Sequence, residues 1–410
     1  MTIDARDFGA AGDSRTMDTE ALQRAIDACA RTGGRVILQD GVFLTGTLRL
    51  RSHVELHIEA GSTLLASPRC GDYPPIALAR VNAAMLPRGR ASCLLLAEDC
   101  ENVALTGRGT IDCSGSSFVT PAPPEDYLRY RRIDAPTPPR VVFLCGCRQA
   151  LVQDVSVVNA PAGWAFFVHA CDTVSLDRVK VSGDMDYPNN DGIHINCSRN
   201  VGVTDCTLDC SDDTIIVRAN SASLPENTPC ENVTVTGCHL HSHAAGIRVG
   251  WLGDGVIRSC AFTNLTMTDC TAGISFSLPA NTGDARWPDQ GREATRIENL
   301  LFSNIVFARG YDSPVYMNIA DHPSVQCAGI RDVTFSHMQG GSARLPRLFG
   351  RADCPLERIT FTDCTFRQLP LDAVEDGRTH GSLIHKDREC HGLELRHADV
   401  RFVNTSFSVI

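Results

Sequence analysis

Asn200-Val-Gly-Val-Thr-Asp-Cys-Thr-Leu208 returns further along the chain as Asn232-Val-Thr-Val-Thr-Gly-Cys-His-Leu240. In both copies aliphatic and polar residues alternate, which is the pattern of a half-buried β-strand, and a cysteine follows the strand. Relatives of this segment recur at intervals of about 22 to 36 residues. They are residues 103–111, 151–157, 174–181, 257–262, 265–271, 300–307, 333–338 and 359–366.

Repeats of this length indicate a solenoid, because each short unit can bury its apolar face only against its neighbours. The pattern lacks the leucines of a leucine-rich repeat, and its spacing is too uneven for a propeller. We therefore predict an all-β fold, a single-stranded right-handed parallel β-helix. The recurring cysteine suits a narrow interior where a small apolar side chain stacks on its copy in the next coil.

The N-terminal segment has a different pattern. Residues 18–29 carry apolar side chains at helical spacing, with Asp18 as the expected N-cap, and Gly33-Gly34 ends the helix. We expect this helix to cover the open end of the solenoid. Residues 1–410 are predicted to form one β-helix domain, with the cap and first strands in 1–50. Residues 116–141 and 279–293 are expected to be loop excursions.

Composition excludes several classes of protein. The 410 residues are 43% hydrophobic and 21% charged, with a net charge of −10, which is typical of a globular protein. No run of Lys or Arg indicates nucleic acid or an anionic membrane as a partner. No apolar run is long enough to span a membrane, and the N-terminus does not read as a secretory signal. We therefore expect a cytoplasmic location and 19 cysteines that are reduced, mostly buried thiols.

The strongest chemical signal lies in two consecutive coils. Asn190-Asp191-Gly192-Ile193-His194-Ile195 aligns with Asp212-Asp213-Thr214-Ile215-Ile216-Val217, so that Asp191 faces Asp213 and Asn190 faces Asp212. Neighbouring strands lie about 4.8 Å apart, which gathers three carboxylates at one place. Glycoside hydrolysis requires one carboxyl group as an acid and another as a base. Asp191 and Asp213 are expected to be partners, with Asp212 standing apart.

The same register extends to neighbouring coils and predicts two columns of side chains. Because side chains alternate along a strand, a slip of one residue would reverse every face. The first column is Trp164, Asp191, Asp213, Ala245 and Ala272. The second column is Phe167, His194, Ile216, Arg248 and Ser275.

Nearly the whole chain resembles the polygalacturonase family, glycoside hydrolase family 28. The family's Asn-Thr-Asp motif corresponds to Asn189-Asn190-Asp191, and its Gly-Asp-Asp motif to Ser211-Asp212-Asp213. The resemblance implies a right-handed β-helix and an inverting mechanism without a cofactor. It also implies that Asp212 is the general acid, while Asp191 and Asp213 hold and activate water.

Two family motifs are altered. The Gly-His-Gly motif falls on Ala244-Ala245-Gly246, and the Arg-Ile-Lys motif falls on Ser275-Phe276-Ser277. In the family these cations hold the galacturonate carboxylate, and a pair of serines cannot replace a charged, bidentate contact. We therefore expect a neutral sugar or a different uronic-acid linkage in place of ordinary polygalacturonase activity. Arg248 is a candidate to replace the lost cations, or else to form a salt bridge with the acids.

Other side chains near the acids are candidates for binding substrate. Arg218 is expected to pair with Asp212 or Asp213, whereas Trp164 and Trp251 are interpreted either as sugar platforms or as core residues. The full set is Trp164, Asn190, His194, Arg218, His243, Arg248 and Trp251. A basic aromatic cluster at Tyr127 and 129–132 lies on the first excursion, as a solvated loop or a contact for an acidic oligosaccharide. Neither Cys145-Gly-Cys147 nor the histidines at 239, 241 and 243 has convincing metal-ligand spacing, so no metal is predicted.

The leading hypothesis is an inverting glycoside hydrolase that trims pectin-related plant cell-wall oligosaccharides, with the substrate as its partner. A cytoplasmic location implies short substrates and exo-action, and residues 116–141 are the expected segment to close one end of the groove. The alternatives are a lyase or epimerase on the same scaffold, or a non-catalytic carbohydrate-binding β-helix.

Overall fold

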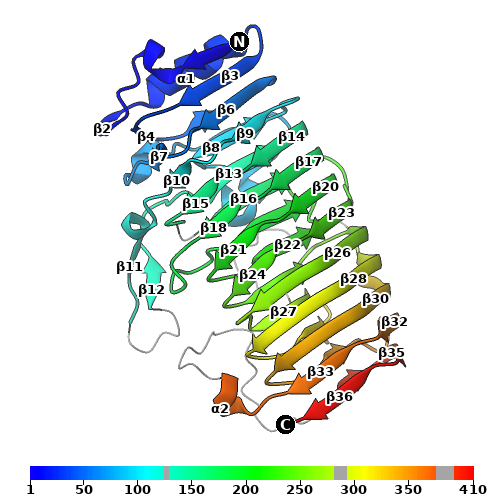
Figure 1. The fold of residues 1–410 in the computed structure, drawn as a ribbon. Helices are drawn as coiled ribbons and strands as arrows, with labels where there is room; N and C mark the ends of the chain where they lie inside the picture. The colour runs from blue at the N-terminus through cyan, green and yellow to red at the C-terminus, as the bar shows by residue number, and fades with distance from the viewer. Residues whose placement is uncertain (124–128, 162, 281–292, 375–391) are drawn as a thin grey trace.

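Parallel strands stack coil upon coil along the whole molecule (Figure 1). The computed structural model describes residues 1–123, 129–161, 163–280, 293–374 and 392–410. Within these residues, strands form an 11-stranded sheet, a 23-stranded sheet and a separate pair. Every ladder in the two large sheets is parallel, as a right-handed solenoid requires. The predicted right-handed parallel β-helix is confirmed.

The 11-stranded sheet, here called the floor sheet, takes one strand from each coil and carries the acids at its edge. Its strands are β5 (Leu48–Arg49), β8 (Leu95–Glu98), β13 (Arg140–Cys145), β16 (Trp164–His169), β19 (Ile193–Asn196), β22 (Ile215–Arg218), β25 (Ala245–Val249), β27 (Ala272–Leu278), β29 (Val315–Ile319), β31 (Arg347–Phe349) and β34 (Glu394–Arg396).

The 23-stranded sheet supplies the other two faces, which merge where β26, β28 and β30 run through both. Its strands are β1 (Thr2–Asp4), β2 (Asp13–Met17), β3 (Gly34–Leu38), β4 (Val42–Thr45), β6 (Val54–Ile58), β7 (Thr63–Ala66), β9 (Ala104–Thr106), β10 (Thr110–Asp112), β14 (Arg148–Gln153), β15 (Ser156–Val158), β17 (Asp172–Asp177), β18 (Lys180–Ser182), β20 (Arg199–Thr204), β21 (Thr207–Cys210), β23 (Cys230–Thr236), β24 (His239–Ser242), β26 (Val256–Thr268), β28 (Thr295–Gly310), β30 (Cys327–Ser342), β32 (Leu356–Thr362), β33 (Thr365–Gln368), β35 (Ala398–Val403) and β36 (Ser406–Val409).

Helical segments are short and lie outside the coils. They are η1 (Ala5–Phe8), α1 (Thr19–Cys29), η2 (Cys70–Asp72), η3 (Ala83–Met85), η4 (Pro87–Gly89), η5 (Gly115–Phe118) and α2 (Leu371–Val374). None of the helices in the described part of the chain is both long and apolar enough to cross a membrane.

Helix α1 lies over the N-terminal end of the solenoid (Figure 1). It buries Leu22 and Ile26 on one face, as the helical spacing predicts. Asp18 is the N-cap residue, as predicted, but its carboxylate does not bond within the helix. It accepts the backbone N–H groups of Ala11 and Gly12 at 2.7 and 3.0 Å, and so ties down the turn that precedes β2.

The interior is filled by identical side chains stacked from coil to coil. The rings of Phe262, Phe302, Phe335 and Phe361 form one such stack, with centroids 4.6 to 5.2 Å apart. The cysteines have an additional role beyond the predicted apolar stacking. The thiol of Cys206 lies 3.3 Å from the carbonyl oxygen of Thr204 and 3.5 Å from that of Leu176 in the preceding coil. Cysteine is thus small, apolar and a weak donor at each bend.

The prediction of reduced thiols throughout is wrong for one pair. Cys327 and Cys354 form a disulfide, whereas the other described cysteines are free, and all of these except Cys70 are buried. Burial raises the pKa of several thiols, that of Cys93 to about 12, which leaves them protonated and unreactive.

The excursion at residues 116–141 contains secondary structure that the sequence pattern did not indicate. Strands β11 (Val119–Pro121) and β12 (Tyr130–Arg132) pair as an antiparallel hairpin. Tyr130 packs edge-on against Tyr187, and Arg129 lies 3.3 Å from the Asp186 carboxylate. Of the predicted basic aromatic cluster, Tyr127 lies outside the described residues, as does most of the predicted 279–293 loop.

Candidate active site

The strand pairings fix both predicted columns. Ile193 pairs with Ile215, which places Asp191 beside Asp213 two residues earlier. In the second column His194 pairs with Ile216, which pairs with Arg248, which pairs with Ser275. The predicted register is confirmed. The sequence did not show why residue 192 is glycine, because a Cβ atom there would lie 2.3 Å from the carbonyl oxygen of Thr214 in the next coil.

Three carboxyl groups meet where β19 and β22 begin. One oxygen from each of Asp191, Asp212 and Asp213 lies within 4.8 Å of the other two. The predicted separation of Asp212 from the other acids is therefore wrong. Asp191 and Asp213 are buried, at 4% and 5% exposed, whereas Asp212 is only half-buried. Asp212 is therefore the carboxyl group that an incoming ligand reaches first.

Both oxygens of Asp213 are bound by Arg248. The Arg248 guanidinium donates Nε to Oδ2 of Asp213, and Nη2 to Oδ1 at 3.0 Å. The backbone N–H of Ala245 donates to the same Oδ1 at 2.9 Å. A forked pair of this kind is among the strongest charged hydrogen bonds, and it fixes the carboxylate in the plane of the guanidinium. Of the two roles considered for Arg248, the salt bridge with the acids is present. The ring centroid of Trp251 lies 4.5 Å from Cζ of Arg248.

Asp191 is oriented by a histidine. Its Oδ2 lies 2.9 Å from Nε2 of His194, and the His194 ring stacks on Trp164 at a centroid distance of 3.6 Å. Burial, followed by the positive charge of Arg218, lowers the pKa of His194 well below its usual value. The imidazole is therefore neutral and can donate Nε2–H to a carboxylate. Trp164 is 6% exposed and serves here as the support of His194.

Asp212 is held by a residue that the sequence reasoning did not select. Asn189 donates Nδ2 to Oδ2 of Asp212 at 2.9 Å and accepts Nη2 of Arg132 at its own Oδ1 at 2.7 Å. Arginine is only a donor, so the Asn189 amide oxygen must face Arg132 and its NH₂ group must face Asp212. The hairpin β11–β12 thereby reaches the acids. Asn189 belongs to the Asn-Asn-Asp triplet, and that was the available signal.

The pKa values of Asp191 and Asp212 are both raised well above that of a free carboxyl group. Burial is the largest cause in each case, followed by the charge of Asp213 for Asp191 and that of Asp191 for Asp212. The cations are distributed unequally. Arg88, Arg248 and Arg132 all favour the ionised form of Asp191, whereas Arg248 is the principal cation acting on Asp212. Both carboxyl groups therefore bind a proton more tightly than a free carboxyl group does.

The raised pKa of Asp212 predicts the pH dependence of any reaction that uses Asp212 as an acid. Activity falls as the pH rises through the raised pKa of Asp212, so the alkaline limb of kcat/KM lies above the range of an ordinary carboxyl group. Asn189→Gly removes a donor to the carboxylate and is expected to move this limb to higher pH. Glycine tolerates the φ of 52° at this position. Asn200→Gly, at a φ of 57° on the surface, is the control. An unshifted limb in Asn189→Gly would contradict the role of Asn189.

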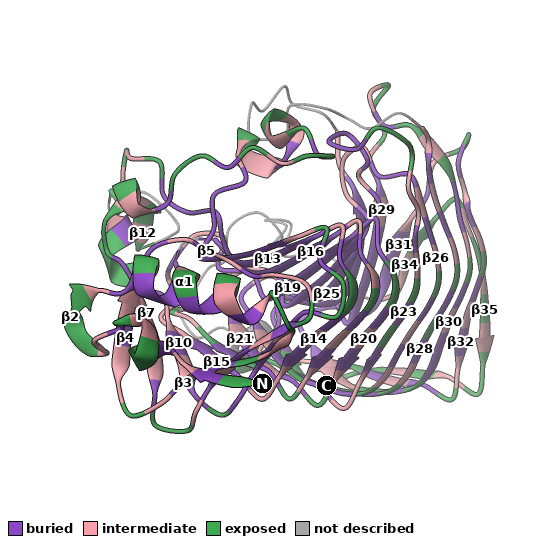
Figure 2. Cartoon of the chain, turned by 90° about the horizontal axis from the view of Figure 1, so that it is seen from above, coloured by how far each residue is buried: buried purple, intermediate pink, exposed green. Residues whose placement is uncertain are grey.

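The floor sheet is covered on the N-terminal side of the acids. The column that contains His194 begins with Leu96, Phe143 and Phe167, whose outward side chains are buried. Residues 76–91, here called the end wall, cover them through Ile76, Val81 and Leu86. Figure 2 shows β13, β16 and β19 in the colour of buried residues. The closing segment is thus 76–91, and the prediction that gave this role to 116–141 is wrong.

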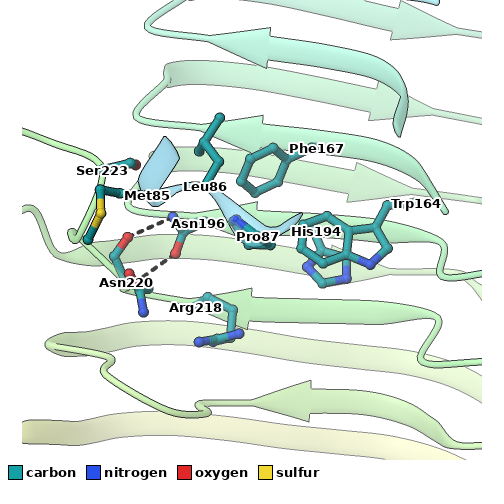
Figure 3. A pocket seen from close by; sticks show the side chains of 10 residues that line it. All are labelled: Met85, Leu86, Pro87, Trp164, Phe167, His194, Asn196, Arg218, Asn220 and Ser223. Carbon is teal, nitrogen blue, oxygen red and sulfur yellow. Dashed lines mark hydrogen bonds between the residues drawn. The ribbon is translucent and has the colours of Figure 1, made fainter. Parts of the chain in front are cut away.

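The space left between end wall and floor is small. Met85, Leu86 and Pro87 face Phe167, His194 and Asn196 across it (Figure 3). Its volume is about 30 Å³. A water molecule needs roughly 10–15 Å³ on this measure, so the cavity holds two or three waters and no sugar ring.

Arg88 brings a further cation that periodicity did not reveal. It lies in η4 of the end wall with a φ of 64°, a left-handed conformation that is unusual for arginine. Its charge lowers the pKa of Asp191, while burial and then repulsion by Arg132 lower the pKa of Arg88 itself. Backbone strain of this kind persists only where the surroundings hold it, and it is concentrated at functional sites.

The remaining predicted residues lie in different surroundings. The expected pairing of Arg218 with Asp212 or Asp213 is wrong, because Arg218 binds Asp254 at 2.7 Å. It lies at the far end of β22 from Asp213, some four to five residues or roughly 15 Å along the strand. His243 is buried with Nδ1 2.9 Å from the carbonyl oxygen of Met185. Asn190 is fully buried, and its carbonyl accepts the N–H of Asp212 at 3.2 Å.

Among the described residues, the three aspartates are the single group of side chains with the spacing of a metal site. Carboxylate oxygens would suit a hard cation such as Mg²⁺ or Ca²⁺. Arg248 already neutralises one of the three, and two raised pKa values allow another to stay protonated. These two effects lower the negative charge of the group.

Comparison with known proteins agrees with the fold. Residues 78–346 match the sequence model of the family described as glycosyl hydrolases family 28. An exo-poly-alpha-D-galacturonosidase of Dickeya chrysanthemi is 26% identical over 327 residues, which cover 69% of this chain and 53% of that protein. The chain thus spans about half the length of this relative.

Two further proteins are similar over a larger share of their length. An exopolygalacturonase of Zea mays is 24% identical over 387 residues, covering 89% of this chain and 83% of that one. The crystal structure of a hyperthermoactive exopolygalacturonase from Thermotoga maritima superposes with a TM-score of 0.76 at 21% identity. That comparison covers 100% of this chain and 92% of the other.

Proposed function

The chain belongs to glycosyl hydrolase family 28, and on that premise we propose that it is an exo-acting, inverting hydrolase of pectin-related oligosaccharides. The observation that carries the proposal is the arrangement of three carboxyl groups in unequal environments, directly beside a closed end of the floor sheet. Family membership supports hydrolysis, and the relatives described as exo-enzymes support removal of terminal sugars.

In the proposed reaction, the half-buried Asp212 protonates the oxygen of the scissile bond. Asp191 and Asp213 hold a water molecule between them, and Asp191 takes its proton as the water attacks the anomeric carbon. Arg248 binds both oxygens of Asp213 and so fixes the orientation of this side chain toward the water. One carboxyl group donates a proton while another accepts one, so the bond breaks without a charged intermediate in bulk water.

The stereochemical course depends on whether water or a carboxylate attacks the anomeric carbon. Carboxyl groups are usually about 6.5–9.5 Å apart in inverting enzymes and about 5–5.5 Å apart in retaining ones. The nearest oxygens here lie within 4.8 Å. We favour inversion because Arg248 and Ala245 occupy both oxygens of Asp213, and His194 binds Asp191. These contacts reduce the nucleophilicity of both carboxylates but leave them able to accept a proton from water.

Unpartnered donors near Asp213 support an acidic sugar as the substrate. Nη1 of Arg248, Nε1 of Trp251 and Oγ of Ser275 are buried and have no hydrogen-bond partner among the described residues. Arg248 and Ser275 are paired neighbours in one outward column. The family's motif cation at residue 275 is therefore absent, but the adjacent position one coil earlier carries a guanidinium. We propose that a uronate carboxylate or a ring hydroxyl satisfies these donors, which are costly to bury unpaired.

The expected product is a single terminal sugar. Purified protein should release monosaccharide from acidic pectic oligosaccharides, and the substrate should shorten by one residue at a time. Chromatography of the products from oligosaccharides labelled at either end measures this directly. Neutral galactan and arabinan oligosaccharides of the same length are the matched controls. Internal fragments as the first products would contradict exo-action, and no product from any substrate would contradict hydrolysis.

The same reaction mixture shows whether the anomeric configuration is inverted or retained. An NMR spectrum taken before the released sugar equilibrates shows which anomer forms first. Inversion requires the anomer opposite to that of the cleaved bond. The same anomer as in the substrate would instead place Asp213 or Asp191 as a nucleophile.

A further inference from the structure

Arg140, the first residue of β13, is a buried cation that the reaction does not use. It is 1% exposed and is among the largest fully buried side chains in the described chain. None of the ion pairs between described residues includes it. A charge without a carboxylate in such a position is costly, so its retention calls for a structural reason.

The guanidinium of Arg140 is bound by carbonyl oxygens and aromatic faces. Nη1 donates to the carbonyl of Arg90 at 2.7 Å, and Nη2 donates to that of Pro87 at 3.0 Å. Its Cζ lies 4.8 to 5.3 Å from the ring centroids of Phe143, Trp164 and Phe167. Both kinds of contact favour a cation in an apolar site. Burial lowers its pKa only to about 10, so the charge persists at neutral pH.

Both acceptor carbonyls belong to the end wall, and they flank its strained residue. Pro87 and Arg90 lie on either side of Arg88, whose left-handed backbone must be held by its surroundings. The three rings belong to the floor, from β13 and β16. Arg140 therefore joins the wall to the floor through Pro87, Trp164 and Phe167, which line the cavity in Figure 3.

The wall makes further polar contacts besides those to Arg140. The backbone N–H of Ala79 donates to Oε1 of Glu98 at 2.6 Å, and Nε of Arg80 lies 3.7 Å from Oδ2 of Asp99. The backbone N–H of Asn82 donates to the carbonyl of Ser223 at 2.8 Å. The apolar contacts of Ile76, Val81 and Leu86 are non-directional and would allow the wall to shift or slide. The two hydrogen bonds of Arg140 are directional, because both donors belong to one rigid guanidinium group and each meets a backbone carbonyl oxygen.

We propose that Arg140 is the positioning residue that sets the mode of attack, by locking the end wall over the floor so that only the end of a sugar chain reaches the acids. The inference rests on the proposed hydrolase function and deepens it. Without the hydrogen bonds of Arg140, the wall can move away from Phe143 and Phe167. A sugar chain can then lie along the floor sheet and continue past the acids. Internal bonds then become accessible.

The test is the substitution Arg140→Met, which keeps the length of the side chain and its contact with the rings but removes both donors. Wild type should release almost no product from a long pectic chain whose end is blocked, because it attacks only free chain ends. The variant should cleave the same chain internally at least about 10-fold faster. Its rate on a short oligosaccharide should change less, since the three aspartates are intact. Arg178→Met removes an exposed arginine that pairs with Asp154 and is the matched control.

Hydrogen exchange supplies a readout that does not depend on activity. Backbone amides of residues 76–91 should exchange faster in Arg140→Met than in wild type, while those of β19 and β22 should not. Leu86→Asp places a charge in the apolar contact between the wall and the floor and should weaken that contact. It should give the same product change, and it serves as the test if Arg140→Met does not fold. Unchanged exchange in the wall together with purely terminal cleavage in a folded variant would overturn the proposal. A wild-type protein that hydrolyses nothing would refute the proposed function instead.

Discussion

Asp212→Asn is expected to lower kcat on the natural linkage by about 10³- to 10⁴-fold, which corresponds to about 4–5.5 kcal/mol of transition-state stabilisation. Asparagine fits the same space but has no proton to transfer to the leaving oxygen. Asp212 is the half-exposed member of the three acids, and its pKa is raised well above that of a free carboxyl group. Initial rates on an acidic pectic oligosaccharide give the measurement.

A second substrate separates the role of the acid from general damage to the site. A glycoside with a nitrophenol leaving group needs no protonation, so Asp212→Asn should cleave it at a rate close to that of wild type. Asp213→Asn and Asp191→Asn should remain slow on both substrates. Asp205→Asn is the control, because Asp205 is exposed and its φ of 52° suits asparagine. Full activity of Asp212→Asn on the natural linkage would reject it as the acid.

The same variant should be at least as stable as wild type at neutral pH. The folded-state pKa of Asp212 is raised, so the native protein binds this proton more tightly than the unfolded chain does. The stability that follows is present at acid pH and is lost as the pH rises from the unfolded pKa to the folded one. Asparagine does not ionise, so it avoids that loss. Thermal melts at two pH values measure the difference, and a lower Tm for the variant at neutral pH would contradict it.

Arg248→Met is expected to destabilise the fold by about 3–5 kcal/mol and to abolish activity. The substitution leaves the buried carboxylate of Asp213 without the two guanidinium contacts that compensate its charge. Chemical denaturation measures the loss. Arg248→Lys keeps the charge but not the fork, so we expect an intermediate stability.

A double variant distinguishes the charge from the packing of Arg248. Asp213→Asn combined with Arg248→Met removes both members of the pair and should recover most of the lost stability. It should remain inactive, because no carboxylate is left at that position to hold water. If the double variant is no more stable than Arg248→Met alone, the destabilisation comes from lost contact with Trp251 instead.

The coil architecture was predictable because it depends on local alternation and spacing. Strands such as β20 and β23 follow directly from the repeat of aliphatic and polar residues, and their stacking follows from the need to bury one face. The register of Asp191 on Asp213 was predictable for the same reason, since a slip of one residue would turn the flanking isoleucines outward.

The end wall was not predictable in the same way. Residues 76–91 have no strand period, and their apolar side chains bury against Phe143 and Phe167, which are far away in sequence. Of Leu96, Phe143 and Phe167 in the outward column, only Phe167 was placed by the sequence pattern, and the strand pairings add the other two. These apolar residues required a cover, but nothing local showed which segment provides it.

The sequence by itself determined the solenoid, the position of its cap and the meeting of three aspartates, because periodic burial constrains each coil against the next. Only the tertiary structure decided the partners of those aspartates. Asn189 and Arg132 reach Asp212, Arg248 binds Asp213, and Arg218 turns to Asp254. Such contacts depend on the directions of long polar side chains and on loops that fold over the floor, and neither follows a period that the chain can display.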